Sequence, residues 1–217
     1  MVTTHPHIPT GIPVFDLVGE SESGCPGLPR GRALHLFGAE KSGKTTLALM
    51  ASAAVCKAGG TVLYLDYMCG FMPDYAESLG VPYMDTDHFM LLQPDSQKDG
   101  IKAALVAIRE GADLVVFDAI GAPGMEMQTL MDMRSLWGNV LPILVLKAQK
   151  SGTAILGLDY EVEGHTIGGK VWEFWSPRRI QVEQITPGVV GYEVVKDTLD
   201  RDVPPLGDFT LPTGEER

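Results

Sequence analysis

The chain alternates short apolar runs with segments in which apolar residues recur at helical spacing. Five apolar runs predict β-strands near residues 33–37, 61–66, 89–92, 113–118 and 141–147. These runs lack polar alternation, which is typical of parallel strands covered on both faces. The segments beside them predict helices near residues 45–58, 73–79, 97–110, 125–138 and 168–175. In the third of these, Ile101, Ala104, Leu105 and Ile108 make an amphipathic stripe.

The last third of the chain has a different pattern. Strands are expected near residues 178–184, 190–196 and 207–211, and they are more polar and closer together. Pro187-Gly188 marks a turn between the first two, so these strands predict an antiparallel extension at one sheet edge. The predicted fold is α/β, with a central, mostly parallel sheet flanked by helices. We expect a flexible N-terminal segment (1–9), one core (10–211) and a frayed tail (212–217).

Composition narrows the class of protein. A chain of 217 residues with 45% hydrophobic and 21% charged residues suits one globular domain. It has no apolar run long enough for a membrane span and no signal-peptide core, so a cytoplasmic location is expected. Cys25, Cys56 and Cys69 show no C-x-x-C spacing and are expected to be reduced thiols. The net charge of −11 argues against a general nucleic-acid coat protein.

A phosphate-binding loop is the strongest chemical signal. Residues 38–45 read G-A-E-K-S-G-K-T, between a predicted buried strand and a predicted helix. Glycines let consecutive N–H groups point at phosphate oxygens, and the dipole of the following helix adds to anion binding. Lys44 is placed for the β- and γ-phosphates, and the Thr45 hydroxyl for Mg²⁺. The predicted nucleotide-binding residues here are Gly38, Ala39, Glu40, Lys41, Ser42, Gly43, Lys44, Thr45 and Thr46.

A second carboxylate site follows from strand order. Asp118 ends the apolar run Leu114-Val115-Val116-Phe117, at the carboxyl edge of a parallel sheet. This is the place of a Walker B aspartate, which holds Mg²⁺ directly or through water. The alternative is that Asp118 only caps the loop that begins at Ala119.

Several motifs in one order resemble the RecA recombinase family from about Thr10 to about Gly214. They are a T-G-x-x-x-x-D opening at residues 10–16, G-L-P-x-G-R at 27–32, the phosphate loop with Glu40 third, Q-P-D at 93–95 and the Asp118 strand. The family's amino-terminal docking helix and separate carboxy-terminal domain have no counterpart, and such economy suggests a bacteriophage-type homologue. The resemblance implies ATP and Mg²⁺ as cofactors, with Lys44, Glu40 and Asp118 as catalytic residues and the general base unassigned.

Other positions of the family's ATP site are partly kept. Tyr75 matches a tyrosine that stacks on adenine, although an amphipathic core tyrosine is an alternative. Lys196 matches a lysine that reaches a neighbouring subunit's phosphate, whereas Thr198 replaces its companion lysine. Met68 stands where the family has the glutamate that polarises water, and a thioether cannot do this. Met72 replaces an adenine-binding aspartate, and Lys147-Ala148-Gln149-Lys150 is matched to the strand that senses the γ-phosphate.

The resemblance also implies two DNA-binding loops. The first, after Asp118, is shortened and methionine-rich, which favours core packing or a pliable partner surface. The second, Ser151–Gly169, ends in the family's paired glycines. The candidate phosphate contacts are Lys150, Lys170, Arg178 and Arg179. Tyr160, Trp172, Phe174 and Trp175 are expected either to stack on bases or to pack against the sheet.

Three functions remain open at this point. The leading one is an ATP-dependent RecA-like recombinase core that assembles with copies of itself on single-stranded DNA. The second is a hydrolysis-deficient RecA paralogue that acts as a regulatory or scaffolding partner, favoured by Met68 and by the shortened first loop. A weaker third is a ring-forming motor. The phosphate-binding loop is complete, whereas Met68 replaces the residue expected to polarise water. We therefore expect the protein to bind ATP and to hydrolyse it only weakly, in a DNA-dependent way.

Overall fold

The computed structural model describes residues 7–16, 26–121, 130–162, 164–199 and 206–212. The helices are α1 (Lys44–Lys57), α2 (Pro73–Ser78), α3 (Gln97–Glu110), α4 (Leu130–Ser151) and α5 (Gly169–Trp175). The strands are β1 (His7–Ile8), β2 (Leu28–Pro29), β3 (Ala33–Gly38), β4 (Val62–Asp66), β5 (Phe89–Leu92), β6 (Leu114–Asp118), β7 (Ala154–Val162), β8 (His165–Thr166), β9 (Arg178–Thr186), β10 (Val189–Asp197) and β11 (Leu206–Thr210).

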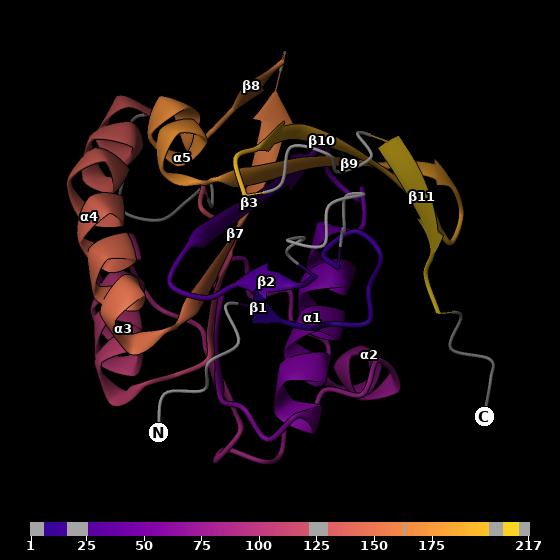
Figure 1. Cartoon of the computed structure of the whole chain (residues 1–217), viewed down its shortest axis with the longest axis horizontal. Helices are drawn as coiled ribbons and strands as arrows, with labels where there is room; N and C mark the ends of the chain where they lie inside the picture. The colour runs from indigo at the N-terminus through magenta and orange to yellow at the C-terminus, as the bar shows by residue number, and fades with distance from the viewer. Residues whose placement is uncertain (1–6, 17–25, 122–129, 163, 200–205, 213–217) are drawn as a thin grey trace.

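One twisted sheet runs through the molecule (Figure 1). Its strand order is β11-β10-β9-β3-β7-β6-β4-β5, and the pairs from β9 to β5 are all parallel. β10 and β11 add to β9 in antiparallel fashion. The predicted α/β class, with a mostly parallel sheet and an antiparallel C-terminal extension, is therefore confirmed.

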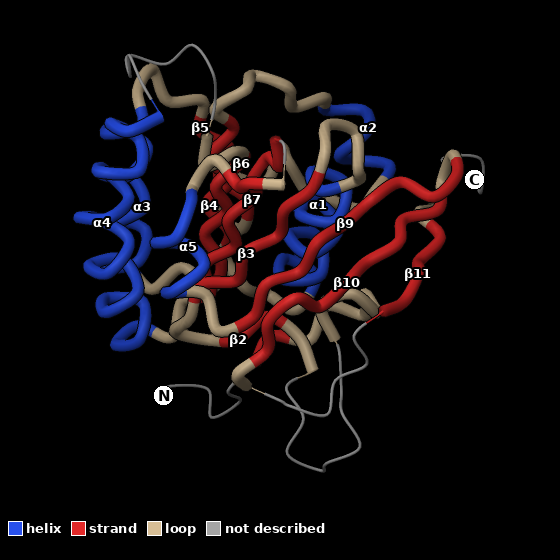
Figure 2. Tube along the Cα trace, turned by 90° about the horizontal axis from the view of Figure 1, so that it is seen from above, coloured by secondary structure: helices blue, strands red, loops and turns tan. Residues whose placement is uncertain are grey.

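Helices cover both faces of the sheet, as the view in Figure 2 shows. α1 and α2 pack on one face around Leu47, Tyr64 and Phe89. α3, α4 and α5 pack on the other around Phe117, Trp137 and Trp172. Because both faces are covered, β3, β4 and β6 are buried along their whole length, which explains their continuous apolar runs.

Local chemistry sets the ends of the helices. The Ser96 hydroxyl accepts from the Asp99 N–H at 3.2 Å and caps α3, which ends at Gly111 with φ of 89°. α1 begins after Gly43, whose φ is 95°. A Cβ at Gly43 would lie 2.7 Å from Val190, so both the backbone conformation and the packing require glycine there.

The predicted strand at 141–147 is wrong, because these residues lie inside α4. The buried side chains recur at the three- to four-residue spacing of one helix face, at Trp137, Leu141, Leu144 and Val145. The strand beside β6 is instead β7, which runs through the segment predicted to be the second DNA loop. The helix expected at 125–138 is longer than predicted, and its first residues, with Met125 and Met127, lie outside the described residues.

The ends of the chain and of the sheet complete the arrangement. His7 and Ile8, placed in the predicted flexible segment, pair with β2. Residues 1–6 and 213–217 lie outside the described residues, with most of the two predicted terminal segments. β5 and β11 are the two edges of the sheet in the described part of the chain. On β5, Met90, Leu91 and Leu92 are 38–40% exposed.

Candidate functional site

The phosphate loop connects β3 to α1 at the carboxyl edge of the sheet. It lines a cavity of about 290 Å³ with residues 41–46, Tyr160 and the β10 residues Val189 and Val190. Gly38 has φ of 157°, and a Cβ there would lie 2.1 Å from the Val182 carbonyl oxygen. The close approach of β9 therefore makes glycine obligatory at the start of the loop. A cavity of loop amides before a long helix suits a phosphate chain.

Lys44 is the cation at the base of this cavity. Its amine donates to the Gly38 carbonyl at 3.0 Å, the Ala39 carbonyl at 2.6 Å and the Ser42 hydroxyl at 3.2 Å. Burial lowers the pKa of Lys44 to about 8, and the nearby carboxylates of Asp118, Asp159 and Glu40 oppose this effect. An anion in the cavity would favour the charged amine, so the site is prepared for phosphate.

Thr45 and Asp118 form a hydrogen-bonded pair beside the phosphate loop. The Thr45 hydroxyl donates to Oδ2 of Asp118 at 3.0 Å, and the Tyr64 hydroxyl donates to the same oxygen at 2.7 Å. Asp118 is buried at the end of β6, and burial raises the pKa of its carboxyl despite both hydrogen bonds. A buried carboxylate and a hydroxyl are oxygen ligands of the kind Mg²⁺ prefers, so the two side chains fit the predicted metal role.

Tyr75, on α2, lies beside α1. Its hydroxyl is 2.9 Å from that of Thr46 on α1, and its ring packs partly exposed against the core. Glu40 and Lys41 are exposed in the loop. The adenine contact of Tyr75 and the phosphate contacts of Glu40 and Lys41 stay predictions.

Lys196 is engaged within its own chain. Its amine donates to the carbonyls of Glu173 at 2.6 Å and Phe174 at 3.3 Å, at the C-terminal end of α5. The predicted contact with a neighbouring subunit's phosphate stays a prediction.

The position expected to polarise water has no catalytic group. Met68 is 41% exposed in the turn after β4. The preceding Asp66 cannot replace the missing carboxylate, because it accepts from the Gly70 and Phe71 amides at 3.1 and 2.9 Å and from the Gln93 side chain at 2.9 Å. Its hydrogen-bonding capacity holds the turn together.

The segment matched to the γ-phosphate-sensing strand was placed wrongly. Lys147 and Lys150 lie near the end of α4, before β7 begins, and so at the opposite edge of the sheet from the phosphate loop. The strand that lies between β3 and β6 is β7, and its carboxyl end carries Asp159 and Tyr160. The Tyr160 ring lies 4.6 Å from the Lys44 amine and lines the phosphate cavity. Tyr160, which was expected either to stack on bases or to pack against the sheet, thus lines the phosphate-loop cavity.

The four predicted DNA contacts do not form one surface. Arg178 is fully buried, where Nε donates to Asp197 at 2.6 Å and Nη1 to the Phe15 carbonyl at 3.0 Å, so its prediction as a phosphate contact is wrong. Arg179 packs against His35 and Phe37. Lys150 lies near the end of α4, before β7 begins, whereas Lys170 follows the carboxyl end of β7. Only Lys170 is exposed at the carboxyl edge.

A basic cavity beside Lys170 was missed by sequence reasoning. Arg134, His165 and Lys170 line it with the Gly168–Gly169 turn and Glu173, around a volume of about 490 Å³. Arg134 comes from α4 and lies against Gly169, with weak bonds of 3.4 Å to the carbonyls of Thr166 and Ile167. Arg134 is distant in sequence from His165 and Lys170, so the charge pattern gave no signal that the three lie together. Nearby, Trp172 is fully buried and packs as core, whereas Phe174 is 76% exposed.

In the described residues, no helix is long and apolar enough to cross a membrane. Those residues also hold no cluster of three or more His, Cys, Asp or Glu side chains placed for a metal ion, so a cation would depend on Thr45 and Asp118 together with its ligand.

Comparisons with known proteins agree with this site. The family model described as the RecA N-terminal domain matches residues 8–140. Protein RecA of Mycobacteroides abscessus is 33% identical, over 89% of this chain and 57% of its own length. Protein RecA of Acidothermus cellulolyticus is 34% identical over 87% and 58%, and that of Kineococcus radiotolerans 34% over 82% and 54%. The chain therefore spans a little over half the length of these relatives.

Proposed function

Because the chain belongs to the RecA family, we propose that it binds Mg·ATP and acts as an ATP-dependent RecA-like recombinase core. It would assemble with copies of itself on single-stranded DNA during recombination and repair, in the cytoplasm. The observation that carries the proposal is the placement of Lys44 and Thr45 in the lining of one cavity, with the Thr45 hydroxyl hydrogen-bonded to the Asp118 carboxylate. These are the three side chains that a triphosphate with its metal requires.

The residues divide the work of nucleotide binding. The loop amides and Lys44 would take the β- and γ-phosphates, in place of the carbonyl contacts that Lys44 now makes. Thr45 and Asp118 would hold Mg²⁺, which neutralises negative charge on the phosphate oxygens. Tyr75 would support the base. Val189 and Val190 on β10 close the cavity with an apolar wall that excludes water.

Calorimetry of Mg·ATP binding tests this assignment. Lys44→Ala should abolish detectable binding, because it removes the buried cation from the phosphates. Lys57→Ala is the control, since it removes an exposed lysine from the opposite end of α1 and should retain binding. Thermal melts must show that both variants are folded. Equal affinity of wild type and Lys44→Ala would overturn the nucleotide assignment.

Hydrolysis should be slow. A positioned general base typically contributes about 10²–10⁴-fold, and Met68 cannot act as one. The Asp66 carboxylate accepts hydrogen bonds from the turn that follows β4, and the Asp118 carboxylate accepts hydrogen bonds from Tyr64 and Thr45. Of Asp66, Asp118 and Glu40, this leaves Glu40, which is exposed in the loop. We assign it the residual activity, which Glu40→Gln should remove.

DNA binding is assigned to the Arg134–His165–Lys170 cavity. It faces the carboxyl edge of the sheet, and its cations can take backbone phosphates of a single strand. With a net charge of −11, one domain repels DNA at long range, so binding should depend on ATP-driven assembly of several copies.

A salt titration of single-stranded DNA binding tests the cavity. Affinity should fall with salt at a log–log slope of about −0.7 per phosphate neutralised. Arg134→Ala with Lys170→Ala should reduce both affinity and slope, whereas Lys150→Ala, at the opposite edge, should change neither. Equal effects of the two sets would show that this cavity is not the DNA site.

The second candidate function is a hydrolysis-deficient paralogue that regulates or scaffolds a partner. Met68 is the specific observation that favours it. Mg·ATP binding without DNA binding at low salt would select it over the recombinase. Electron micrographs with ATP, with and without single-stranded DNA, would separate filaments from rings, and rings would favour the weaker motor alternative.

A further inference from the structure

The hairpin formed by β9 and β10 is held against the phosphate loop. The Val182 carbonyl on β9 leaves no room for a Cβ at Gly38, and the Val190 side chain on β10 leaves none at Gly43. The hairpin turn is also tied to the end of β11, because the Leu211 N–H donates to a carbonyl of this turn at 2.7 Å. The side chains that the hairpin directs at the loop are therefore fixed in place by close packing.

A β-bulge sets which side chain of β9 faces the loop. Ile185 is skipped in the pairing of β9 with β10, so it is the extra residue of a bulge. It lies over Gly191 on the far face of the hairpin, 2.8 Å from where a Cβ of that glycine would be. Gln184 comes two residues after Val182 and so lies on the loop side. Its side chain lines the phosphate-loop cavity together with residues 41–46.

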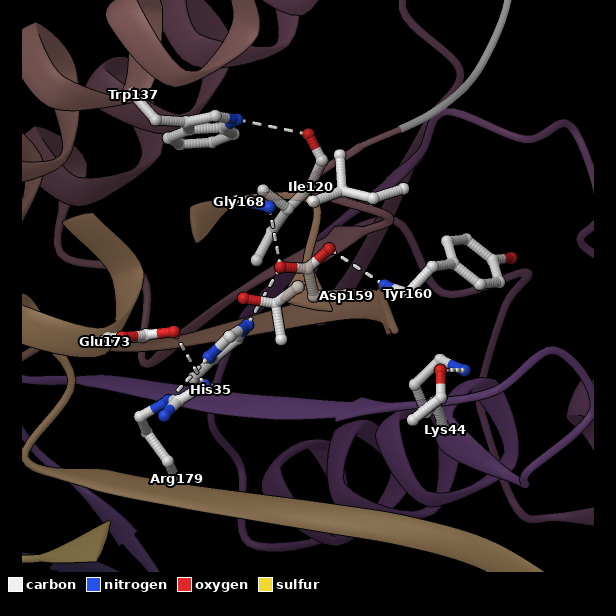
Figure 3. A network of polar contacts seen from close by, with 12 residues as sticks. His35, Lys44, Ile120, Trp137, Asp159, Tyr160, Gly168, Glu173 and Arg179 are labelled. Carbon is white, nitrogen blue, oxygen red and sulfur yellow. Dashed lines mark hydrogen bonds and ion pairs between the residues drawn. The ribbon is translucent and has the colours of Figure 1, made fainter. Parts of the chain in front are cut away.

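Gln184 carries the hydrogen-bond donor of this wall. Outside residues 41–46, the cavity is lined by Tyr160, Gln184, Gly188, Val189, Val190 and Leu211. Only Tyr160 and Gln184 among these have polar side chains, and Figure 3 shows Tyr160 beside Lys44, whose amine is 4.6 Å from the ring. In the part of the chain that the structure describes, the Gln184 carboxamide makes no hydrogen bond, whereas Gln181 on the same strand donates to Glu161 at 2.6 Å. Two N–H groups of Gln184 are therefore available to a ligand in the cavity.

The chemistry of a triphosphate matches this donor. Phosphate oxygens accept hydrogen bonds and carry negative charge, so they bind N–H groups and cations. The loop amides and Lys44 supply such groups from one side of the cavity. On the facing side the valines of β10 have no donor. Gln184 is the side chain of that side that can donate to an oxygen turned away from the loop.

We propose that Gln184 is a nucleotide-contacting residue, whose carboxamide donates to the phosphate chain from the side opposite the loop. The inference deepens the Mg·ATP binding proposed above and rests on it. Because β9 and the loop belong to the same chain, a single copy of the protein can make this contact.

Calorimetry with two probes tests the contact. Mg·ATP contains the whole nucleotide, whereas Mg·tripolyphosphate contains a phosphate chain without sugar or base. Gln184→Ala should weaken the binding of both probes by about tenfold or more, which is the usual effect of losing a hydrogen bond to a charged group. Thr186→Ala is the control, because it removes an exposed polar side chain from the same hairpin that does not line the cavity. It should bind both probes as the wild type does.

Two further substitutions separate a ligand contact from packing. Gln184→Lys keeps an N–H donor on a long side chain and should retain or increase the affinity for Mg·ATP. Gln184→Glu keeps the shape but has only acceptors at neutral pH, and its charge repels phosphate, so it should bind more weakly than Gln184→Ala. Thermal melts must show that all variants are folded. A side chain that only packs in the hairpin would not give this order of affinities.

Each outcome decides one point. Equal affinity of the wild type and folded Gln184→Ala for both probes would overturn the inference. A loss confined to Mg·ATP would assign Gln184 to the sugar or base and overturn the phosphate contact. If tripolyphosphate binds too weakly to measure, the order of the Lys, Ala and Glu variants with Mg·ATP decides, and any other order overturns the contact. Absence of Mg·ATP binding to the wild type would instead overturn the nucleotide assignment itself.

The wild type alone provides a second measurement. The side-chain N–H resonances of Gln184 are identified by their absence from the NMR spectrum of Gln184→Ala. They should shift when Mg·ATP saturates the protein, because the carboxamide gains a charged acceptor. Unchanged resonances in the saturated complex would overturn the proposal.

Discussion

Replacing Tyr64 by Phe should destabilise the protein by about 1.5–3 kcal/mol, which is typical of a hydrogen bond to a charged partner. The Tyr64 hydroxyl donates to Asp118 at 2.7 Å, and both side chains are buried. Water therefore cannot replace the lost donor, and Oδ2 keeps only the Thr45 hydroxyl. The ring packing is unchanged, so the loss reports on the hydrogen bond.

A double-mutant cycle sharpens the magnitude. In an Asp118→Asn background the same Tyr64→Phe change removes a neutral hydrogen bond, typically worth about 0.5–1.5 kcal/mol. The difference between the two losses should be about 1–1.5 kcal/mol, and it belongs to the charge of Asp118. Urea unfolding at pH 7 without Mg²⁺ or nucleotide measures all four proteins. Equal losses in both backgrounds would refute the view that Tyr64 supports an ionised carboxylate.

The remaining predictions test other parts of the site. Met68→Glu should raise ATP hydrolysis, and an unchanged rate would leave Glu40 as the base. Burial raises the pKa of the Asp118 carboxyl above 3.8, so its ionised form destabilises the folded protein at pH 7 without Mg²⁺. Asp118→Asn should therefore match or exceed the wild type in stability at pH 7. Thermal melts should show this difference vanish as the pH falls toward 3.8. The pKa of His35 is lower in the folded protein than in the unfolded chain, so protonation below pH 6.5 favours unfolding. The free energy of unfolding of the wild type should therefore fall as the pH falls, by at most about 1.4 kcal/mol per pH unit from this group. The His35→Phe variant should lack this contribution. Arg178→Ala should cost about 3–5 kcal/mol in chemical denaturation, as expected when a buried ion pair is broken.

The parts of the fold that follow from local pattern could be predicted. The phosphate loop is a local motif, and its strand and helix lie next to it in sequence. The predicted bounds of α3 agree with the observed ones, because apolar residues at helical spacing alternate with polar residues along its whole length. The fully buried β3 and β6 were recognisable as apolar runs.

The middle of the chain was not predictable in the same way. Residues 141–147 are almost uniformly apolar, so the exposed Ile143 and Leu146 hide the helical period that Leu141, Leu144 and Val145 follow. Pro142 inside α4 adds a signal against a helix. Because the apolar run at 141–147 predicts a strand, the sequence places β7 in a loop, and Asp159 and Tyr160 then have no predicted place beside the phosphate loop.

The roles of charged residues depended on contacts across the sheet. Arg178 and Arg179 are adjacent and looked equivalent in sequence. Strand alternation sends Arg178 to Asp197 in the core and Arg179 to His35 on the other face. No local sequence pattern distinguishes a basic residue that pairs with a buried carboxylate from one that is exposed and can bind a ligand.

The open edges of the sheet have a consequence for how this protein behaves in solution. Among the described residues, no strand pairs with the outer edge of β5, which carries three partly exposed apolar side chains. Such an edge is a template for uncontrolled strand addition. Mutual repulsion between copies that each carry a charge of −11 opposes such contacts at neutral pH. Near the isoelectric point of about 4.8 that repulsion disappears. Colloidal stability is therefore a property of the whole surface charge, and precipitation should set in as the pH approaches this value.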